Sequence, residues 1–306
     1  MAVLNQMKPT NALEQSHGLA QSLRPQLALA LGCDRAGKTV LTHRYMAYPL
    51  SVSPIFRLEP DRPSNRAYLY RMNTSPGLLS GDAIGVSLQL SAGSQLYLAD
   101  QSATKVHTMS QPEARASLTY SIELGEEATL EFLPEPLILF ADAALTQTME
   151  IVVHESAGLS LGEIILPGRL ARGEFYQFRQ YLSRIRVRSA EGKILFVEAM
   201  NLSGRDNRFT QSALFATGRV LGSLILILPT AIATAENLAA LGRNIELLAD
   251  SEAANSLCLA SSVLPGDRGL FVRAIASTTR ELQSCFRSAV NYVRKLRNQA
   301  QLPYSV

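Results

Sequence analysis

The chain has 306 residues, of which 47% are hydrophobic, and a formal net charge of +3 at pH 7. A chain of this length and apolar content can bury a full core, which argues against intrinsic disorder. Basic and acidic residues nearly balance, and no block of lysine or arginine of the kind that follows a phosphate backbone is present, so we expect no nucleic-acid partner.

The first 20 residues are polar and lack periodicity, which predicts a mobile N-terminal segment before a single β-rich domain over residues 21–306. Beyond them, short runs with alternating apolar, β-branched or aromatic residues end at Gly, Pro, Asn or Asp. These runs predict strands at 26–32, 39–45, 67–72, 84–90, 95–99, 116–124, 128–133, 146–153, 159–166, 174–187 and 193–202. No helix-period segment separates them, so we expect a mainly β fold of stacked antiparallel or mixed layers rather than a parallel β-α-β sheet.

Helical spacing appears only in the C-terminal part, over about residues 230–300. Residues 235–250 repeat leucine and isoleucine at helical intervals, with Thr234 at the capping position. A second helix is predicted from Thr278, which forms a capping-box pattern with Glu281, to about Asn298. Its apolar stripe comprises Leu282, Phe286, Ala289, Val293 and Leu296. Between the helices, residues 256–263 and 269–276 predict a hairpin.

The longest strongly apolar run, residues 220–228, is far shorter than the roughly 20 residues of a bilayer span, so we expect a buried strand and no membrane partner. No charged and apolar leader of the kind that directs secretion is seen. Cys33, Cys258 and Cys285 are odd in number and lack a CxxC pair, which favours a reducing compartment over a disulfide framework. The expected location is the cytoplasm.

One motif favours an enzyme. Gly32-Cys33-Asp34-Arg35-Ala36-Gly37-Lys38-Thr39 has the spelling of a P-loop, and it follows an apolar run. A nucleotide hydrolase using Lys38 and Thr39 is therefore the alternative function. A working P-loop needs a helix that starts at the lysine, whereas the residues after Thr39 have the pattern of a strand. We favour a hairpin turn in which the glycines supply positive φ angles.

Other catalytic patterns are weaker. The four histidines are scattered without metal-ligand spacing, and no Gly-x-Ser-x-Gly elbow presents a nucleophile. We expect no catalytic residue and no tightly bound cofactor.

Several ordered segments carry more information than these motifs. They are Asn73-Thr74-Ser75-Pro76-Gly77-Leu78-Leu79-Ser80-Gly81-Asp82, then Gln101-Ser102-Ala103-Thr104-Lys105-Val106, then Leu130-Glu131-Phe132-Leu133-Pro134-Glu135-Pro136, and finally Gly168-Arg169 with Gly173-Glu174. In this order and spacing they resemble the UreD family of urease accessory proteins, called UreH in some organisms. The resemblance spans about residues 24–200 and continues more faintly to Arg294. Ser80 and His107 depart from the family pattern.

The resemblance implies a protein without catalytic activity of its own. Members of the family act with a helical accessory protein, UreF, and a GTPase, UreG, on the urease apoprotein, and help to insert nickel. It also implies a layered, helix-like winding of β-strands with a few helices near the C-terminus. Nickel in transit should meet sparse oxygen ligands, because a closed set of imidazoles or thiolates would hold the ion too tightly.

Three acids are the candidates for such a nickel path: Asp82, Glu163 and Glu174. Each adjoins a glycine-rich or apolar element that we expect in the interior, where an unpaired charge is costly. Each also has a structural alternative. Asp82 can cap the turn after Gly81, and Glu174 can pair with Arg169 or Arg172.

The last helix carries a second candidate site. Arg280, Arg287 and Arg294 recur every seven residues, and a straight helix drifts only about 20° per heptad, so the three form one stripe beside the apolar seam. Arginine is enriched at protein interfaces. Since family members contact UreF through C-terminal helices, we expect this row to face UreF; a solvated helix face is the alternative.

Overall fold

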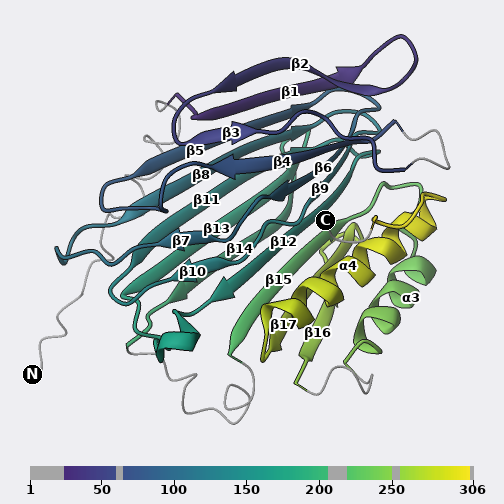
Figure 1. Ribbon diagram of the computed structural model, residues 1–306. Helices are drawn as coiled ribbons and strands as arrows, with labels where there is room; N and C mark the ends of the chain where they lie inside the picture. Colours follow the sequence, from purple (N-terminus) through teal and green to yellow (C-terminus); the bar gives the residue numbers. More distant parts are fainter. Residues whose placement is uncertain (1–23, 60–64, 206–218, 250–255, 304–306) are drawn as a thin grey trace, which may run out of the picture.

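The computed structural model describes residues 24–59, 65–205, 219–249 and 256–303, so the segment expected to be mobile, residues 1–20, lies outside the described residues. Two large β-sheets lie face to face, and two α-helices flank one of them near its C-terminal strands (Figure 1). The mainly β fold with few, late helices is therefore confirmed. No helix within the described ranges is long and apolar enough to cross a membrane.

Sheet A has seven strands and mixes parallel and antiparallel pairing. The order across the sheet is β14 (Ile194–Leu202), β13 (Gln180–Ser189), β11 (Ala144–Val153), β8 (Ala116–Leu124), β5 (Ala83–Leu90), β1 (Leu27–Cys33) and β2 (Thr39–Met46). The strands from β1 to β13 run parallel, and the edge strands β2 and β14 pair antiparallel with their neighbours.

Sheet B repeats this arrangement. Its main path is β16 (Cys258–Val263), β17 (Gly269–Ala276), β15 (Val220–Ile227), β12 (Gly158–Leu166), β9 (Thr129–Phe132), β6 (Gln95–Asp100), β4 (Ala67–Asn73) and β3 (Leu50–Val52). The strands β4, β6, β9 and β12 are parallel, whereas β15, β17 and β16 continue antiparallel. Two short strands lie off this path: β10 (Leu137–Leu139) pairs with β12, and β7 (Thr104–Val106) pairs with β10.

The chain winds between the sheets rather than within one of them. From β4 to β13 successive long strands alternate between sheet B and sheet A, so each turn of the winding adds one strand to each sheet. The opposite sheet thus supplies the crossover that a helix provides in a β-α-β unit. This explains how parallel pairing arises without intervening helices, and it confirms the helix-like winding expected from the family.

Alternating residues of both sheets form the core. Leu118, Tyr120 and Ile122 of β8, for example, point inward and are buried, as the period of two requires. A second apolar cluster covers the outer face of sheet B, where α3 (Ala235–Glu246) and α4 (Thr279–Leu296) pack on β12, β15 and β17. Figure 1 shows both helices on this side. Each is capped as expected: the side chain of Thr234 accepts a hydrogen bond from Asn237 N–H, and Thr278 and Glu281 form a capping box.

Most predicted strands are present within one or two residues of their expected bounds, and residues 220–228 are the buried strand β15. The run at 174–187 was predicted too long. Only its second half is a strand, because Phe175, Tyr176 and Phe178 stack on one another in an irregular segment after a short 3-10 turn, η1 (Leu170–Arg172). The three-residue strands β3, β7 and β10 were missed, since so short a run carries no periodicity.

The P-loop-like segment is a hairpin turn. It joins the antiparallel strands β1 and β2. Thr39 is the first residue of β2, whereas in a P-loop this residue would belong to the phosphate-binding helix. Asp34 shapes the turn, because its Oδ1 accepts hydrogen bonds from the backbone N–H of Ala36 at 2.8 Å and of Lys38 at 2.9 Å. Gly37 has φ of +75°. The turn therefore lacks the helix N-terminus that a phosphate would need.

Candidate functional site

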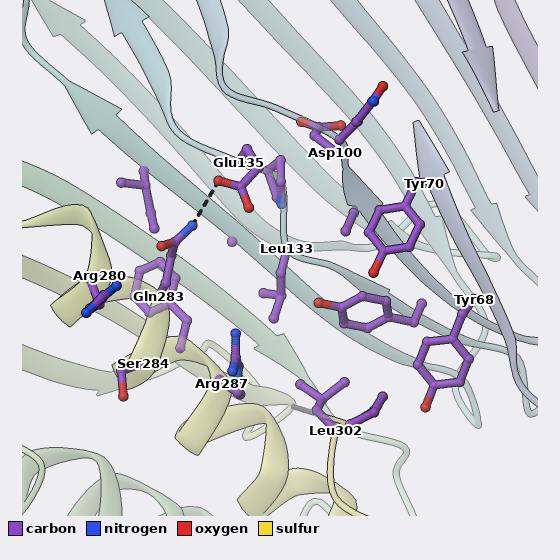
Figure 2. A pocket seen from close by; sticks show the side chains of 18 of the residues that line it. Tyr68, Tyr70, Asp100, Leu133, Glu135, Arg280, Gln283, Ser284, Arg287 and Leu302 are labelled. Carbon is purple, nitrogen blue, oxygen red and sulfur yellow. Dashed lines mark hydrogen bonds between the residues drawn. The ribbon is translucent and has the colours of Figure 1, made fainter. Parts of the chain in front are cut away.

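A pocket of about 540 Å³ lies between the outer face of sheet B and helix α4. Figure 2 shows polar side chains of α4 on one side and tyrosines of β4 on the other. The lining includes Tyr68, Tyr70, Tyr97, Arg280, Gln283, Ser284 and Arg287. Burial raises the pKa of Tyr97 to about 12, so this hydroxyl stays neutral at physiological pH. The pocket thus presents tyrosine hydroxyls opposite arginine side chains.

The hydrogen-bond ladder of sheet B is interrupted beside this pocket, where β12 pairs with β9 only up to Leu161 and with β10 only from Ile165. Strand β9 ends at Phe132, and Pro134 and Pro136 follow, which cannot donate ladder hydrogen bonds. Glu135 stands at this interruption and lines both the outer pocket and a narrow inner cavity. Its Oε2 accepts a hydrogen bond from Gln283 of α4 at 3.0 Å, and burial raises its pKa, as does the nearby charge of Asp100.

The inner cavity is polar although it lies within the core. Its volume of about 30 Å³ leaves room for one or two water molecules. Arg71 and Asp100 form a bidentate ion pair at its start, with Nε to Oδ1 at 2.7 Å and Nη2 to Oδ2 at 2.8 Å. Arg71 also donates to the hydroxyl of Tyr120 on the opposite sheet at 2.7 Å. A paired charge of this kind polarises the cavity without leaving an uncompensated ion.

Glu163 of β12 stands at the far side of the same cavity and is only 7% exposed. Its Oε1 accepts hydrogen bonds from Gln147 and from the hydroxyl of Tyr181, both on sheet A, while its Oε2 has no partner. Burial raises the pKa of Glu163 to about 7, the hydrogen bond from Tyr181 opposes this rise, and the charge of Glu198 adds to it. We call the line from Glu135 through Asp100, Arg71 and Gln147 to Glu163 the polar passage.

A second buried acid lies beyond Glu163. Glu198 of β14 pairs with Arg273 of β17, and this arginine also donates to the hydroxyl of Ser223 at 3.1 Å. Like Glu163, Glu198 keeps one oxygen, Oε2, buried and without a hydrogen-bond partner. The interior therefore holds two carboxylates from opposite sheets, each with one oxygen available.

Comparisons with known proteins bear on the meaning of this site. A family model described as UreD urease accessory protein matches residues 24–305. A urease accessory protein UreD of Trichodesmium erythraeum is 45% identical over 280 residues, covering 91% of this chain and 97% of that protein. The UreD of Mycolicibacterium gilvum is 30% identical and covers 86% of this chain and 91% of its own, and that of Haloarcula marismortui is 27% identical, covering 85% and 82%.

The chain belongs to the UreD family of urease accessory proteins. Within the parts of the chain that the structure describes, no three His, Cys, Asp or Glu side chains converge in a way that would hold a metal ion.

The three candidate acids are not brought together. Glu163 alone lies in the polar passage. Asp82 is partly exposed beside β5, where its Oδ2 accepts the backbone N–H of Leu79 at 2.8 Å, so it shapes the turn before that strand. Glu174 forms an ion pair with Arg169, whose Nε lies 2.8 Å from Glu174 Oε2, and this contact holds the pKa of Glu174 below its usual value. Both residues therefore have the structural roles that the sequence left open.

The three arginines do not form one surface row. Arg280 and Arg287 line the outer pocket, but Arg294 is only 1% exposed, so the expected stripe is wrong at its third member. The reason is the tail after α4, which folds back over the end of the helix: Arg294 Nη1 donates to the carbonyl of Ala300, and Leu302 N–H to Asn291. Heptad spacing cannot anticipate a segment that covers the helix.

Arg294 instead joins a buried charge cluster that ties α4 to sheet B. It contacts both carboxylate oxygens of Glu131, with Nε to Oε1 at 2.8 Å and Nη2 to Oε2 at 2.5 Å. Arg66 lies 2.8 Å from the same carboxylate, and Glu59 lies 3.2 Å from Arg294. Burial alone would raise the pKa of Glu131, but Arg66 and Arg294 outweigh it and hold that pKa below its usual value.

Asp100, Glu135 and Gln147 were not identified from the sequence as members of the site. The signal for Glu135 was present, since a glutamate between two prolines after a buried run marks a strand end. For Gln147 the alternation of β11 points it inward, but only the partner sheet reveals its contact with Glu163.

Proposed function

We propose that this chain is a non-catalytic scaffold of urease maturation that carries nickel toward the apoprotein through the polar passage. The observation that carries the proposal is the position of Glu135, which lines both the surface pocket beside α4 and the inner cavity, where Glu163 keeps one carboxylate oxygen without a hydrogen-bond partner. The ion is the cargo of this path, not a resident cofactor.

The chemistry of the lining supports transient contact. Carboxylates of Glu135 and Glu163 stand singly at the two ends of the passage, with the amide of Gln147 beside Glu163. Between them, both oxygens of Asp100 are paired with Arg71, which balances the charge of that acid. Nickel binds imidazole and thiolate sites tightly, so single carboxylates favour passage over storage. Glu163, with a pKa near 7, can carry negative charge when a cation arrives. Asp82 and Glu174 are left out of this path because each is committed to local structure.

The partners follow from the family. We propose that a helical protein of the UreF type docks over α4, where Arg280 and Arg287 reach the surface pocket, and that a GTPase of the UreG type supplies nucleotide hydrolysis. The hairpin turn at Lys38 supports this division, because it lacks the helix that a P-loop requires. The three cysteines, all free, are consistent with a cytoplasmic site of action.

Co-purification tests the proposal. The tagged chain should retain the helical accessory protein, the GTPase and urease subunits from a cell that expresses all of them, and the isolated chain should hydrolyse neither GTP nor ATP. The proposal would be contradicted if the chain retained none of these proteins in the presence of nickel. It would also be contradicted by magnesium-dependent hydrolysis of GTP or ATP that is lost in Lys38→Ala.

A further inference from the structure

The inner cavity forms the buried part of the polar passage, and Glu163 and Gln147 line its far end. What lies beyond it is the ion pair of Glu198 with Arg273. Register places Arg273 in line with Glu163: Glu163 of β12 pairs with Ser223 of β15, which pairs with Arg273 of β17. Adjacent strands lie about 4.8 Å apart, so the two backbones are separated by about 10 Å, with both side chains on the inner face.

Arg273 also stands at the rim of the molecule. Strand β14, which carries Glu198, is the last strand of sheet A, and β17 is next to last in sheet B. The Arg273 side chain is 35% exposed, whereas that of Glu198 is 9% exposed. The ion pair therefore reaches from the interior to solvent at the open edge of the β-sandwich, beside the last strands of the two sheets.

Two buried carboxylates lie near this edge of the sandwich. Glu163 and Glu198 come from opposite sheets, each is at least nine-tenths buried, and each keeps Oε2 without a hydrogen-bond partner. They are close enough for the charge of Glu198 to act on Glu163, and Arg273 acts on both. Two carboxylates with free oxygens suit a divalent cation, but the guanidinium repels one while it remains paired.

We propose that Arg273 is the gate at the inner end of the polar passage: paired with Glu198 it closes the sandwich edge, and it releases Glu198 when a divalent cation reaches the two carboxylates. The inference rests on the proposed function and adds its exit and control. An arginine suits this role because it stays charged and its long side chain can swing to solvent from a backbone that remains in the sheet.

Nickel binding to the full-length chain tests the gate. With Ni²⁺ alone as the ligand, calorimetry on Arg273→Met, which keeps length without charge, should show at least about tenfold tighter binding than wild type. Adding Glu198→Gln to this variant should remove the gain. Arg186→Met is the matched control, since Arg186 forms an ion pair with Glu150 on the outer face of sheet A and should leave binding unchanged. Equal affinity in folded Arg273→Met and wild type would overturn the gate.

A measurement on the unmodified protein decides the case even if Arg273→Met does not fold. Phenylglyoxal labels accessible arginines, and mass spectrometry reports the rate for each. Nickel should accelerate labelling of Arg273 severalfold and leave Arg186 unchanged; no change at Arg273 would refute the proposal. The conduit stands and the gate fails if Glu163→Gln lowers the nickel content of urease, but nickel does not change the labelling of Arg273 and Arg273→Met does not change the nickel affinity. The gate stands and the conduit fails if nickel changes the labelling and Arg273→Met changes the affinity, but Glu163→Gln leaves the nickel content of urease normal.

Discussion

Replacing Arg294 by methionine should destabilise the chain strongly, although the residue lies on a C-terminal helix whose heptad pattern suggested a surface position. The change leaves Glu131 buried with Arg66 as its remaining close cation. Removing one partner of a buried ion pair costs about 3–5 kcal/mol. This range applies here because Glu131 and Glu59 both lose their contacts with Arg294 while they remain buried, and Arg66 replaces neither contact. For 306 residues the unfolding entropy near the midpoint is about 0.6 kcal/mol/K, so we expect the melting temperature to fall by roughly 5–8 °C.

Thermal denaturation followed by circular dichroism measures this shift, with Arg287→Met as the matched control. Arg287 lies two helical turns earlier, beside the open pocket, and its replacement should change the free energy of unfolding by less than about 0.5 kcal/mol. A melting temperature of Arg294→Met within 2 °C of wild type would refute the reasoning that the cluster ties α4 to sheet B. At about 0.6 kcal/mol/K, such a shift corresponds to only about 1.2 kcal/mol.

Three further predictions follow from other parts of the molecule. Lys38→Ala should leave urease activation nearly normal in a cell-based urease assay, because the exposed lysine belongs to a hairpin turn; loss of activation in folded protein would restore the nucleotide interpretation. The double variant Arg280→Glu and Arg287→Glu should abolish co-purification with the helical accessory protein while the melt of the isolated chain stays close to wild type, and an intact complex would remove α4 from that interface. Folding raises the pKa of Glu163 from 4.5 to about 7, so the native state keeps a proton that the unfolded chain releases in this window, and stability falls as pH rises through it. Glu163→Gln should therefore raise stability at pH 8 by about 3 kcal/mol and have little effect at pH 4, as urea titrations at both pH values would reveal.

Local features of the fold could be predicted from the sequence because their signals are local. The hairpin at Gly37, the cap at Thr234 and the capping box at Thr278 each depend on residues a few positions apart. The alternation of Leu161, Glu163 and Ile165 likewise places the acid on the same inward face as its apolar neighbours.

Features that depend on distant segments could not be predicted. The burial of Arg294 requires the tail at Ala300 and the strand that carries Glu131, 163 positions away. The site formed by Glu163 and Gln147 requires both sheets, and the parallel pairing required the winding itself. Period and spacing give the face of an element, whereas the partner on that face is set by tertiary packing.

The nickel content of urease matured with a Glu163→Gln chain tests the central claim most directly. Urease and its accessory proteins would be produced together with wild-type chain, with Glu163→Gln, or with Glu150→Gln, whose side chain lies on the outer face of sheet A. Nickel per urease active site would be measured by mass spectrometry after each complex has been confirmed by co-purification. The account predicts markedly less nickel with Glu163→Gln and normal nickel with Glu150→Gln, whereas equal loading in all three samples would contradict a path through the polar passage.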